Sequence, residues 1–248
     1  MRPVLRTLLA VPALAAALTA GVPAEATPSI IGGSPASDNY GFPGALFLEG
    51  EFQCGSSLIS PTWAVTAAHC VRGAYEPREF TLRFGSKNRG SGGTAVKARK
   101  IVQSTRNGSD LALVQLASAV QGVPTVKVVK KTPAAGTKFR VLGWGQTSCQ
   151  GADCNGGDST TLRQLDTKVS GGNCGADYFC ITVSTGKSPC YADSGGPGLV
   201  KVGGAWQLAG AVSGTTSQDP RCGATPVRFN DVADFRKWIQ DTTGLALG

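Results

Sequence analysis

The sequence predicts an all-β protein that ends in a single α-helix. Many short segments are apolar, or alternate between apolar and polar residues, and are bounded by Gly, Pro, Ser and Asn, which is typical of strands joined by turns. No helical period of useful length occurs before the C-terminal region. The clearest strand candidates are residues 80–84, 111–116, 126–129, 139–142 and 208–212.

The C-terminal region differs because its apolar residues follow a helical period. A helix capped near Asn230 or Asp231 would bring four apolar side chains to one face. These side chains are Val232, Phe235, Trp238 and Ile239.

The first 26 residues have the features of a secretory signal peptide. Arg2 and Arg6 precede an apolar stretch rich in Leu and Ala, and Ala24-Glu25-Ala26 fits a small-x-small cleavage site. The alternative, a membrane anchor, requires a longer apolar segment than this one, which contains Pro12. We therefore expect a secreted, extracellular protein that does not associate with membranes. The alanine-rich composition suggests a bacterial source.

Residues 190–197 point to nucleophilic catalysis. They place Ser194 among glycines and other small residues, where a backbone can turn sharply and bring its N–H groups close to a bound group. Serine is a weak nucleophile unless a neighbouring base activates it, and a third group must orient that base. The chain has one histidine, His69, so the base can be sought at a single position.

His69 lies in the apolar run 63–70, where a lone histidine is usually a satisfied core residue. Asp110 opens the apolar run 110–116 and, taken alone, is more simply explained as a turn residue. Together with Ser194, however, the two residues complete the set that activated serine chemistry requires. Their order along the chain is histidine, aspartate, serine.

These segments resemble the chymotrypsin-like serine endopeptidases. Residues 66–70, 110–113 and 192–197 are similar to the family motifs TAAHC, DIAL and GDSGGP. Further similarities lie at residues 30–33 (IIGG), 54–60 (CGSSLIS, where the family has CGGSLIS) and 143–145 (GWG). The resemblance covers about residues 30 to 241. It implies two six-stranded antiparallel β-barrels with a C-terminal α-helix, and an active site in the cleft between the barrels.

The resemblance also implies roles for individual residues. His69, Asp110 and Ser194 would form the catalytic triad, and Ser213 would hydrogen-bond the aspartate. The backbone N–H groups of Ala192 and Ser194 would form the oxyanion hole. The family normally has glycine where this chain has Ala192, so a positive φ there would strain the hole.

Activation is expected to follow the family pattern. Cleavage after residue 26 would leave residues 27–29 as a short propeptide before the protease domain, residues 30–248. Removal of the propeptide would free the amine of Ile30 to pair with Asp193. Because Ser29 is not basic, the activator should not be trypsin-like, and trimming by an aminopeptidase or imprecise signal cleavage is the alternative.

The specificity pocket is expected to be small. By the resemblance, Ser188 would occupy the floor position, so the carboxylate that would select Lys or Arg is missing. Thr215 and Val227 align with wall positions that are glycine in open pockets, beside Ser213 and Gly214. The resemblance thus implies cleavage after small or medium apolar residues, with aromatic residues as the alternative.

The eight cysteines all follow the signal peptide and fit a disulfide framework in an oxidising compartment. Sequence alone cannot choose among about 105 pairings. The resemblance implies three pairs and leaves a fourth. The pairs are Cys54–Cys70, Cys174–Cys180, Cys190–Cys222 and, as the remainder, Cys149–Cys154. Zinc ligation is the weaker alternative, because there is no second histidine. We expect neither a metal nor a cofactor, and the basic loop 85–93 does not fit a calcium site.

The chain is basic, with 24 Lys and Arg against 16 Asp and Glu. Residues 1–29 hold Arg2, Arg6 and Glu25, so 22 basic and 15 acidic residues remain in 30–248, a net charge of +7. The basic residues are scattered along the sequence without interleaved aromatics, which favours a solvated basic face over nucleic-acid binding.

The sequence therefore predicts a monomeric secreted zymogen that cleaves protein or peptide substrates through an acyl-enzyme and meets protein inhibitors. The alternative is a weakly active or inactive homologue that acts as a basic secreted binding protein.

Overall fold

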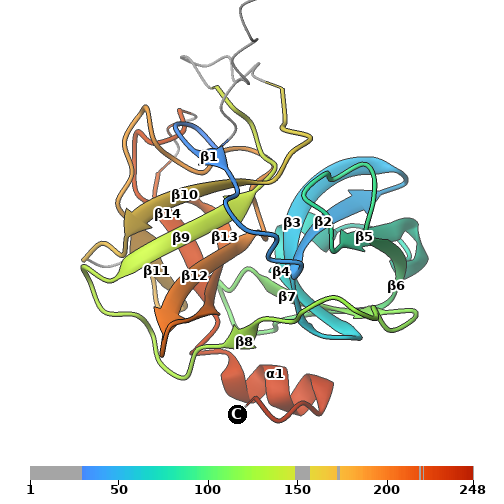
Figure 1. Ribbon diagram of the computed structural model, residues 1–248. Coiled ribbons are helices and arrows are strands. Elements are labelled where there is room, and N and C mark those ends of the chain that lie inside the picture. Colours follow the sequence, from blue (N-terminus) through green and yellow to red (C-terminus); the bar gives the residue numbers. More distant parts are fainter. Residues whose placement is uncertain (1–29, 149–156, 172–173, 218, 220, 248) are drawn as a thin grey trace, which may run out of the picture.

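The computed structural model describes residues 30–148, 157–171, 174–217, 219 and 221–247. Two β-structures lie side by side, and apart from one short N-terminal strand the chain completes the first before it forms the second (Figure 1). The all-β prediction with one C-terminal helix is confirmed, and the segments 80–84 and 111–116 are strands with those bounds.

The first structure is a closed six-stranded barrel with the order β2-β3-β4-β7-β6-β5. In β5, Phe80, Leu82 and Phe84 are buried while the residues between them are partly exposed, as the alternation along a strand requires. The strands are β2 (Pro43–Leu48), β3 (Glu51–Ser60), β4 (Trp63–Ala67), β5 (Phe80–Phe84), β6 (Thr94–Gln103) and β7 (Leu111–Leu116). Two 3₁₀ turns, η1 (Ala68–Val71) and η2 (Pro77–Glu79), precede β5.

The second structure is built on the strand order β10-β9-β12-β13-β14-β11. An antiparallel bridge between Val169 and Ile181 joins the last strand back to the end of the first, so that these six strands also form a barrel. The strands are β9 (Lys138–Gly143), β10 (Arg163–Lys168), β11 (Tyr178–Ile181), β12 (Pro197–Val202), β13 (Ala205–Thr215) and β14 (Val227–Asp231). Two short strands, β1 (Ser34–Pro35) and β8 (Lys127–Val128), pair with β10 and β13.

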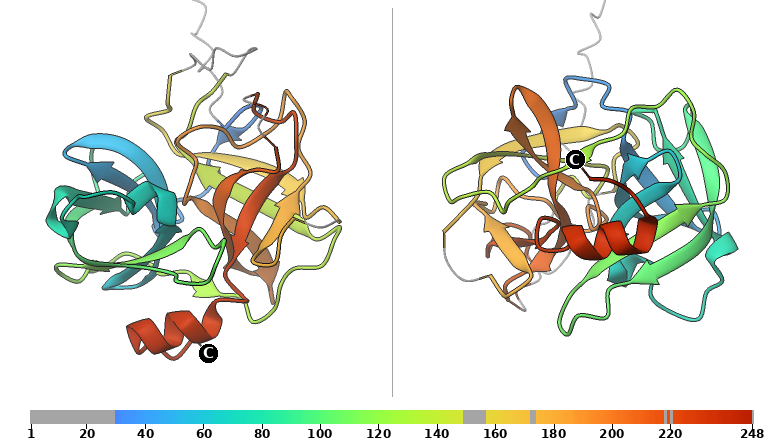
Figure 2. Two further views of the ribbon diagram at one scale, coloured as in Figure 1. Left: turned by 180° about the vertical axis from the view of Figure 1, so that it is seen from behind. Right: turned by 90° about the horizontal axis from the view of Figure 1, so that it is seen from below.

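The helix α1 (Arg236–Thr243) begins later than the sequence predicts. Asn230 and Asp231 do not cap it, because both are buried at the end of β14, and α1 follows after a turn with no side-chain cap. The helix lies beneath the barrels beside β8, and Arg236 donates hydrogen bonds to the carbonyls of Val128 and Val129 (Figures 1 and 2). Among the described residues, no helix has the length and apolar character needed to cross a bilayer.

Candidate active site

His69 and Asp110 are brought together by two neighbouring strands of the first barrel. His69 lies in η1 directly after β4, and Asp110 lies directly before β7. The antiparallel pairing of Ala67 with Leu111 therefore puts the two residues at the same edge of the barrel. Both strands are almost wholly buried, which fixes their register.

The Asp110 carboxylate is held by three hydrogen-bond donors. His69 Nδ1 lies 2.8 Å from Oδ2, and the His69 backbone N–H donates to Oδ1 at 2.9 Å. Ser213, from the second barrel, donates its hydroxyl to Oδ2 at 2.7 Å. Burial acts to raise the pKa of Asp110, but the hydrogen bonds and the charge of His69 outweigh it and lower the pKa. The group is therefore an anion that fixes the orientation of the imidazole and leaves Nε2 facing away from it.

Ser194 lies on the loop before β12, and this loop is locked onto the first barrel. Gly55 N–H donates to the Ser194 carbonyl at 2.7 Å. Gly195 follows with φ +73°, and a Cβ there would come within 2.2 Å of Thr66 Oγ1 and 2.4 Å of the Gly55 carbonyl. Ser194 and His69 line the same cavity, although no hydrogen bond joins their side chains in this structure.

Two backbone N–H groups at Ser194 and near it, those of Ser194 and Ala192, have no hydrogen-bond acceptor among the described residues. The Tyr191 carbonyl accepts a hydrogen bond from Gln146 N–H at 2.9 Å, which fixes the plane of the Tyr191–Ala192 peptide. Ala192 has φ +65°, the left-handed conformation that glycine adopts readily and alanine does not.

Asp193 is fully buried between its neighbours. Its carboxylate accepts backbone hydrogen bonds from Gly145 at 2.8 Å and Cys190 at 3.0 Å. No described residue forms an ion pair with it, and burial raises its pKa to about 7. Ile30 is also fully buried, but in the uncut chain its nitrogen is an amide, so the expected Ile30–Asp193 ion pair is not formed.

The cavity beside Ser194 has a volume of about 290 Å³. Four of the five predicted pocket residues line it, namely Ser213, Gly214, Thr215 and Val227. Ser188 is fully buried and donates its hydroxyl to the carbonyl of Pro189, and of these two residues only Pro189 lines the cavity. The floor role expected of Ser188 therefore stays a prediction.

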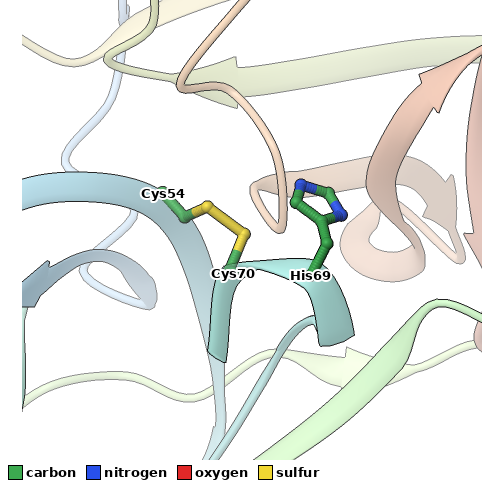
Figure 3. A group of neighbouring side chains, drawn as sticks. All are labelled: Cys54, His69 and Cys70. Atoms are coloured by element: carbon green, nitrogen blue, oxygen red, sulfur yellow. A yellow bond between two sulfur atoms is a disulfide. The ribbon is translucent and has the colours of Figure 1, made fainter. Parts of the chain in front are cut away.

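The described cysteines form the three pairs that the resemblance implies, Cys54–Cys70, Cys174–Cys180 and Cys190–Cys222. Cys149 and Cys154 lie outside the described residues. Figure 3 shows Cys54 and Cys70 joined beside the His69 imidazole. A disulfide has no thiolate to offer, so this group does not meet the needs of a zinc site.

Three residues that the sequence analysis did not assign support the site. Asn230 accepts a hydrogen bond from the backbone N–H of Asp110, and Tyr178 donates its hydroxyl to the carbonyl of Gly108 nearby. Gln146 anchors the Tyr191 carbonyl. Gln146 directly follows the GWG motif, which is the one sequence signal that points to any of the three.

Comparison with known proteins agrees with this geometry. The family model described as Trypsin matches residues 30–239. Brachyurin of Leptuca pugilator is 32% identical over 239 residues, which cover 87% of this chain and 99% of brachyurin. Trypsin-3 of Salmo salar is 32% identical over 232 residues (86% and 92%), and Trypsin-3 of Homo sapiens 30% identical over 245 residues (90% and 76%). All three relatives are animal proteins and give the suggested bacterial source no support.

Proposed function

The chain belongs to the trypsin family of serine proteases, and from this premise we propose that it is an endopeptidase whose His69, Asp110 and Ser194 form the catalytic triad. The observation that carries the proposal is the Asp110 carboxylate, which holds both the ring and the backbone of His69. The contact leaves Nε2 as the nitrogen that faces away from Asp110, and His69 lines the same cavity as Ser194.

In the proposed reaction, Ser194 Oγ attacks the peptide carbonyl while His69 Nε2 takes its proton. His69 then gives that proton to the leaving amine, and an acyl-enzyme remains that water hydrolyses by the same route. Asp110 keeps the proton of neutral His69 on Nδ1 and stabilises the imidazolium that forms, and Ser213 and Asn230 keep Asp110 in place. General acid–base assistance of this kind contributes about 10²–10⁴-fold to the rate.

The N–H groups of Ala192 and Ser194 are proposed to bind the oxyanion. The Gln146 hydrogen bond to the Tyr191 carbonyl supports this role, because the N–H of a trans peptide points away from its carbonyl. The left-handed φ of Ala192 costs about 1–2 kcal/mol in an alanine. Hydrogen bonds on both sides of Ala192 hold it in this conformation: Gln146 holds the Tyr191 carbonyl, and Gly145 and Cys190 hold the Asp193 carboxylate. We therefore infer that the oxyanion hole is formed.

The cavity supports cleavage after small or medium apolar residues. Thr215 and Val227 line the cavity, and by the family resemblance their side chains would shorten the slot, while Ser188 would give it an uncharged floor. Asp219 also lines the cavity, but Arg221 pairs with it at 2.6 Å, so it does not offer a free carboxylate to a basic side chain. The pocket thus lacks an unpaired acid among its described residues.

We further propose that the protein is secreted as a zymogen after loss of residues 1–26 and is activated by removal of residues 27–29. A buried carboxylate without a cation is the supporting observation, because an ammonium group placed next to Asp193 would compensate its burial. The active form is proposed to act as a monomer on protein or peptide substrates, and protein inhibitors that fit the cavity should block it.

One observation favours a second function. The observation is the left-handed φ of Ala192. If this strain turns the Ala192 N–H away from the oxyanion, the hole loses one of its two donors and the rate falls by about 100-fold or more. The chain would then be a weakly active homologue that acts by binding.

Labelling with a serine-directed organophosphorus probe tests the proposal. Protein that begins at Ile30 should be labelled rapidly, whereas protein that begins at Thr27 and the Ser194→Ala variant should not. Absence of labelling in both chain forms would favour the binding homologue. Equal labelling of both forms would support the proposed triad and would contradict the proposal that the chain is a zymogen.

A further inference from the structure

We propose that the outer face of the second barrel carries a binding groove for a sulfated polysaccharide. The groove is defined by six lysines, Lys130, Lys131, Lys138, Lys168, Lys187 and Lys201, together with Arg140. It follows the exposed ends of strands β9, β10 and β12, which face the viewer in Figure 1.

The groove consists of three neighbouring cavities, of which the middle one shares lining residues with each of the other two. The largest, about 760 Å³, shares Thr137 and Lys201 with a cavity of about 360 Å³ on one side. On its other side it shares Asp166, Thr167 and Lys168 with a cavity of about 290 Å³. None of these three cavities has a lining residue in common with the cavity beside Ser194, so a ligand can occupy the groove without entering the proposed active site.

The positive charge of the protein is concentrated in this groove. Seven cationic residues and one acidic residue, Asp166, line it, which gives a net charge of +6, whereas residues 30–248 carry +7 in total. The cations lie as much as 71 positions apart in the sequence (130 to 201), so their scatter along the chain does not reflect their arrangement in space. A polyanion is the ligand that such a groove would attract most strongly.

The lysines have no anionic partner within the described part of the protein. None of the six forms a salt bridge there, and Asp166 is already engaged by Arg140 through two hydrogen bonds of 2.6 and 2.5 Å. Lys138 and Lys168 are direct partners in the β9–β10 ladder. Like charges placed opposite each other destabilise a sheet, so an anion bound between these two lysines would relieve their repulsion.

The aromatic residue of the groove favours a sulfated sugar over a nucleic acid. Strands of nucleic acid bind to grooves in which bases stack on free aromatic faces. Here the Trp206 ring is in contact with Arg140, at 4.8 Å from its centroid, and Lys201, at 4.9 Å, so it serves to position cations. The three disulfides indicate an oxidising, extracellular type of compartment, where sulfated polysaccharides are the abundant linear polyanions.

Heparin binding measured by titration at several salt concentrations tests the proposal, with the full chain carrying Ser194→Ala to prevent autolysis. We expect the triple variant Lys138→Gln, Lys168→Gln, Lys201→Gln to bind heparin at least 10-fold more weakly and to reduce the salt dependence by about three charges. The same three positions changed to arginine should retain binding, because the charge is kept.

The matched control removes three cations from the first barrel, namely Lys97→Gln, Arg99→Gln and Lys100→Gln on strand β6. This variant has the same net charge as the groove variant and should bind heparin within about 3-fold of the parent. Chemically desulfated heparin and a single-stranded oligonucleotide should both bind weakly. The proposal is overturned if the control variant loses binding and the groove variant does not, if the oligonucleotide binds as tightly as heparin, or if heparin does not bind at 0.1 M salt.

Discussion

At the scale of single residues, Ala192 is a position in the candidate site where the backbone adopts a conformation that its side chain disfavours. Its φ of +65° is adopted by glycine at no steric cost. We expect Ala192→Gly to increase the rate of organophosphorus labelling by a few-fold and to increase the free energy of unfolding by about 0.5–1 kcal/mol.

The opposite substitution provides the control for this prediction. Ala192→Val adds β-branching, which resists the left-handed region, and should reduce labelling by about 10-fold or more. Rates and urea midpoints of the three proteins can be compared directly. An unchanged rate in both variants would mean that the Gln146 contact alone sets the Tyr191–Ala192 peptide.

In the proposed specificity, two side chains that line the cavity limit the size of the P1 residue that it accepts. Thr215→Gly combined with Val227→Gly removes both walls, so kcat/KM for substrates with Phe at P1 should rise by about 10–200-fold relative to substrates with Ala. The measurement is a competition between two peptide substrates that differ only at P1. The double variant Thr81→Gly, Val202→Gly serves as control, because it removes the same two types of side chain outside the cavity and should leave the preference unchanged. A preference for Phe already present in the parent would contradict the small pocket.

At the scale of elements, the loop that carries Ser194 depends on close contact between the two barrels. Gly195→Ala would place a methyl group 2.2 Å from Thr66 Oγ1 and 2.4 Å from the Gly55 carbonyl. Because the loop would have to move away from the first barrel, we expect labelling of Ser194 to fall by at least 100-fold.

The matched control for this prediction is Gly203→Ala in the β12–β13 turn. Gly203 also has a positive φ, +57°, but nothing lies within 4 Å of its added Cβ. The control therefore introduces backbone strain of about 1 kcal/mol without a clash and should label at the parental rate. Equal loss of labelling in both variants would show that general destabilisation, rather than the clash, explains the effect.

The sequence predicts those elements whose pattern is local, and it fails where tertiary packing decides. The strands 80–84 and 111–116 follow local alternation or a continuous apolar run between turn residues, and both have the predicted bounds. The predicted helix start is wrong because Asn230 and Asp231, although good capping residues, are buried as the end of β14, and tertiary packing outweighs capping preference.

In the candidate site too, the sequence predicts the residues that lie in local motifs and misses those whose contacts depend on the fold. His69, Asp110 and Ser194 could be found because each lies in a motif of adjacent residues. Asn230 could not, because its contact with Asp110 spans 120 positions and depends on how β14 meets the first barrel. The basic groove was missed for a similar reason, since Lys138 and Lys168 become neighbours only through the β9–β10 ladder.

At the scale of the whole molecule, the burial of Asp193 couples the stability of the uncut chain to pH. The folded state raises the pKa of this carboxyl from 3.8 to about 7, so the folded protein binds a proton more tightly than the unfolded chain does. The resulting stabilisation is complete below about pH 4 and is lost as the pH rises toward 7. The uncut chain should therefore lose stability, relative to an Asp193→Asn variant of the same form, between pH 4 and 7.

The cut form provides the decisive comparison. An ammonium group at Ile30 beside Asp193 would favour the charged carboxylate, lower its pKa and remove the decline between pH 4 and 7. Thermal unfolding of both chain forms, each with and without Asp193→Asn, measures this difference, and contributions from other acids such as Asp158 and Asp231 cancel within each pair. The side-chain amide that this substitution introduces would direct its N–H₂ toward the backbone donor of Gly145 or Cys190. We therefore expect a constant difference in stability between variant and parent, and only the change of that difference with pH is informative. If the decline is the same in the cut and uncut forms, the new amine does not reach Asp193, and cleavage before Ile30 does not act through this carboxylate.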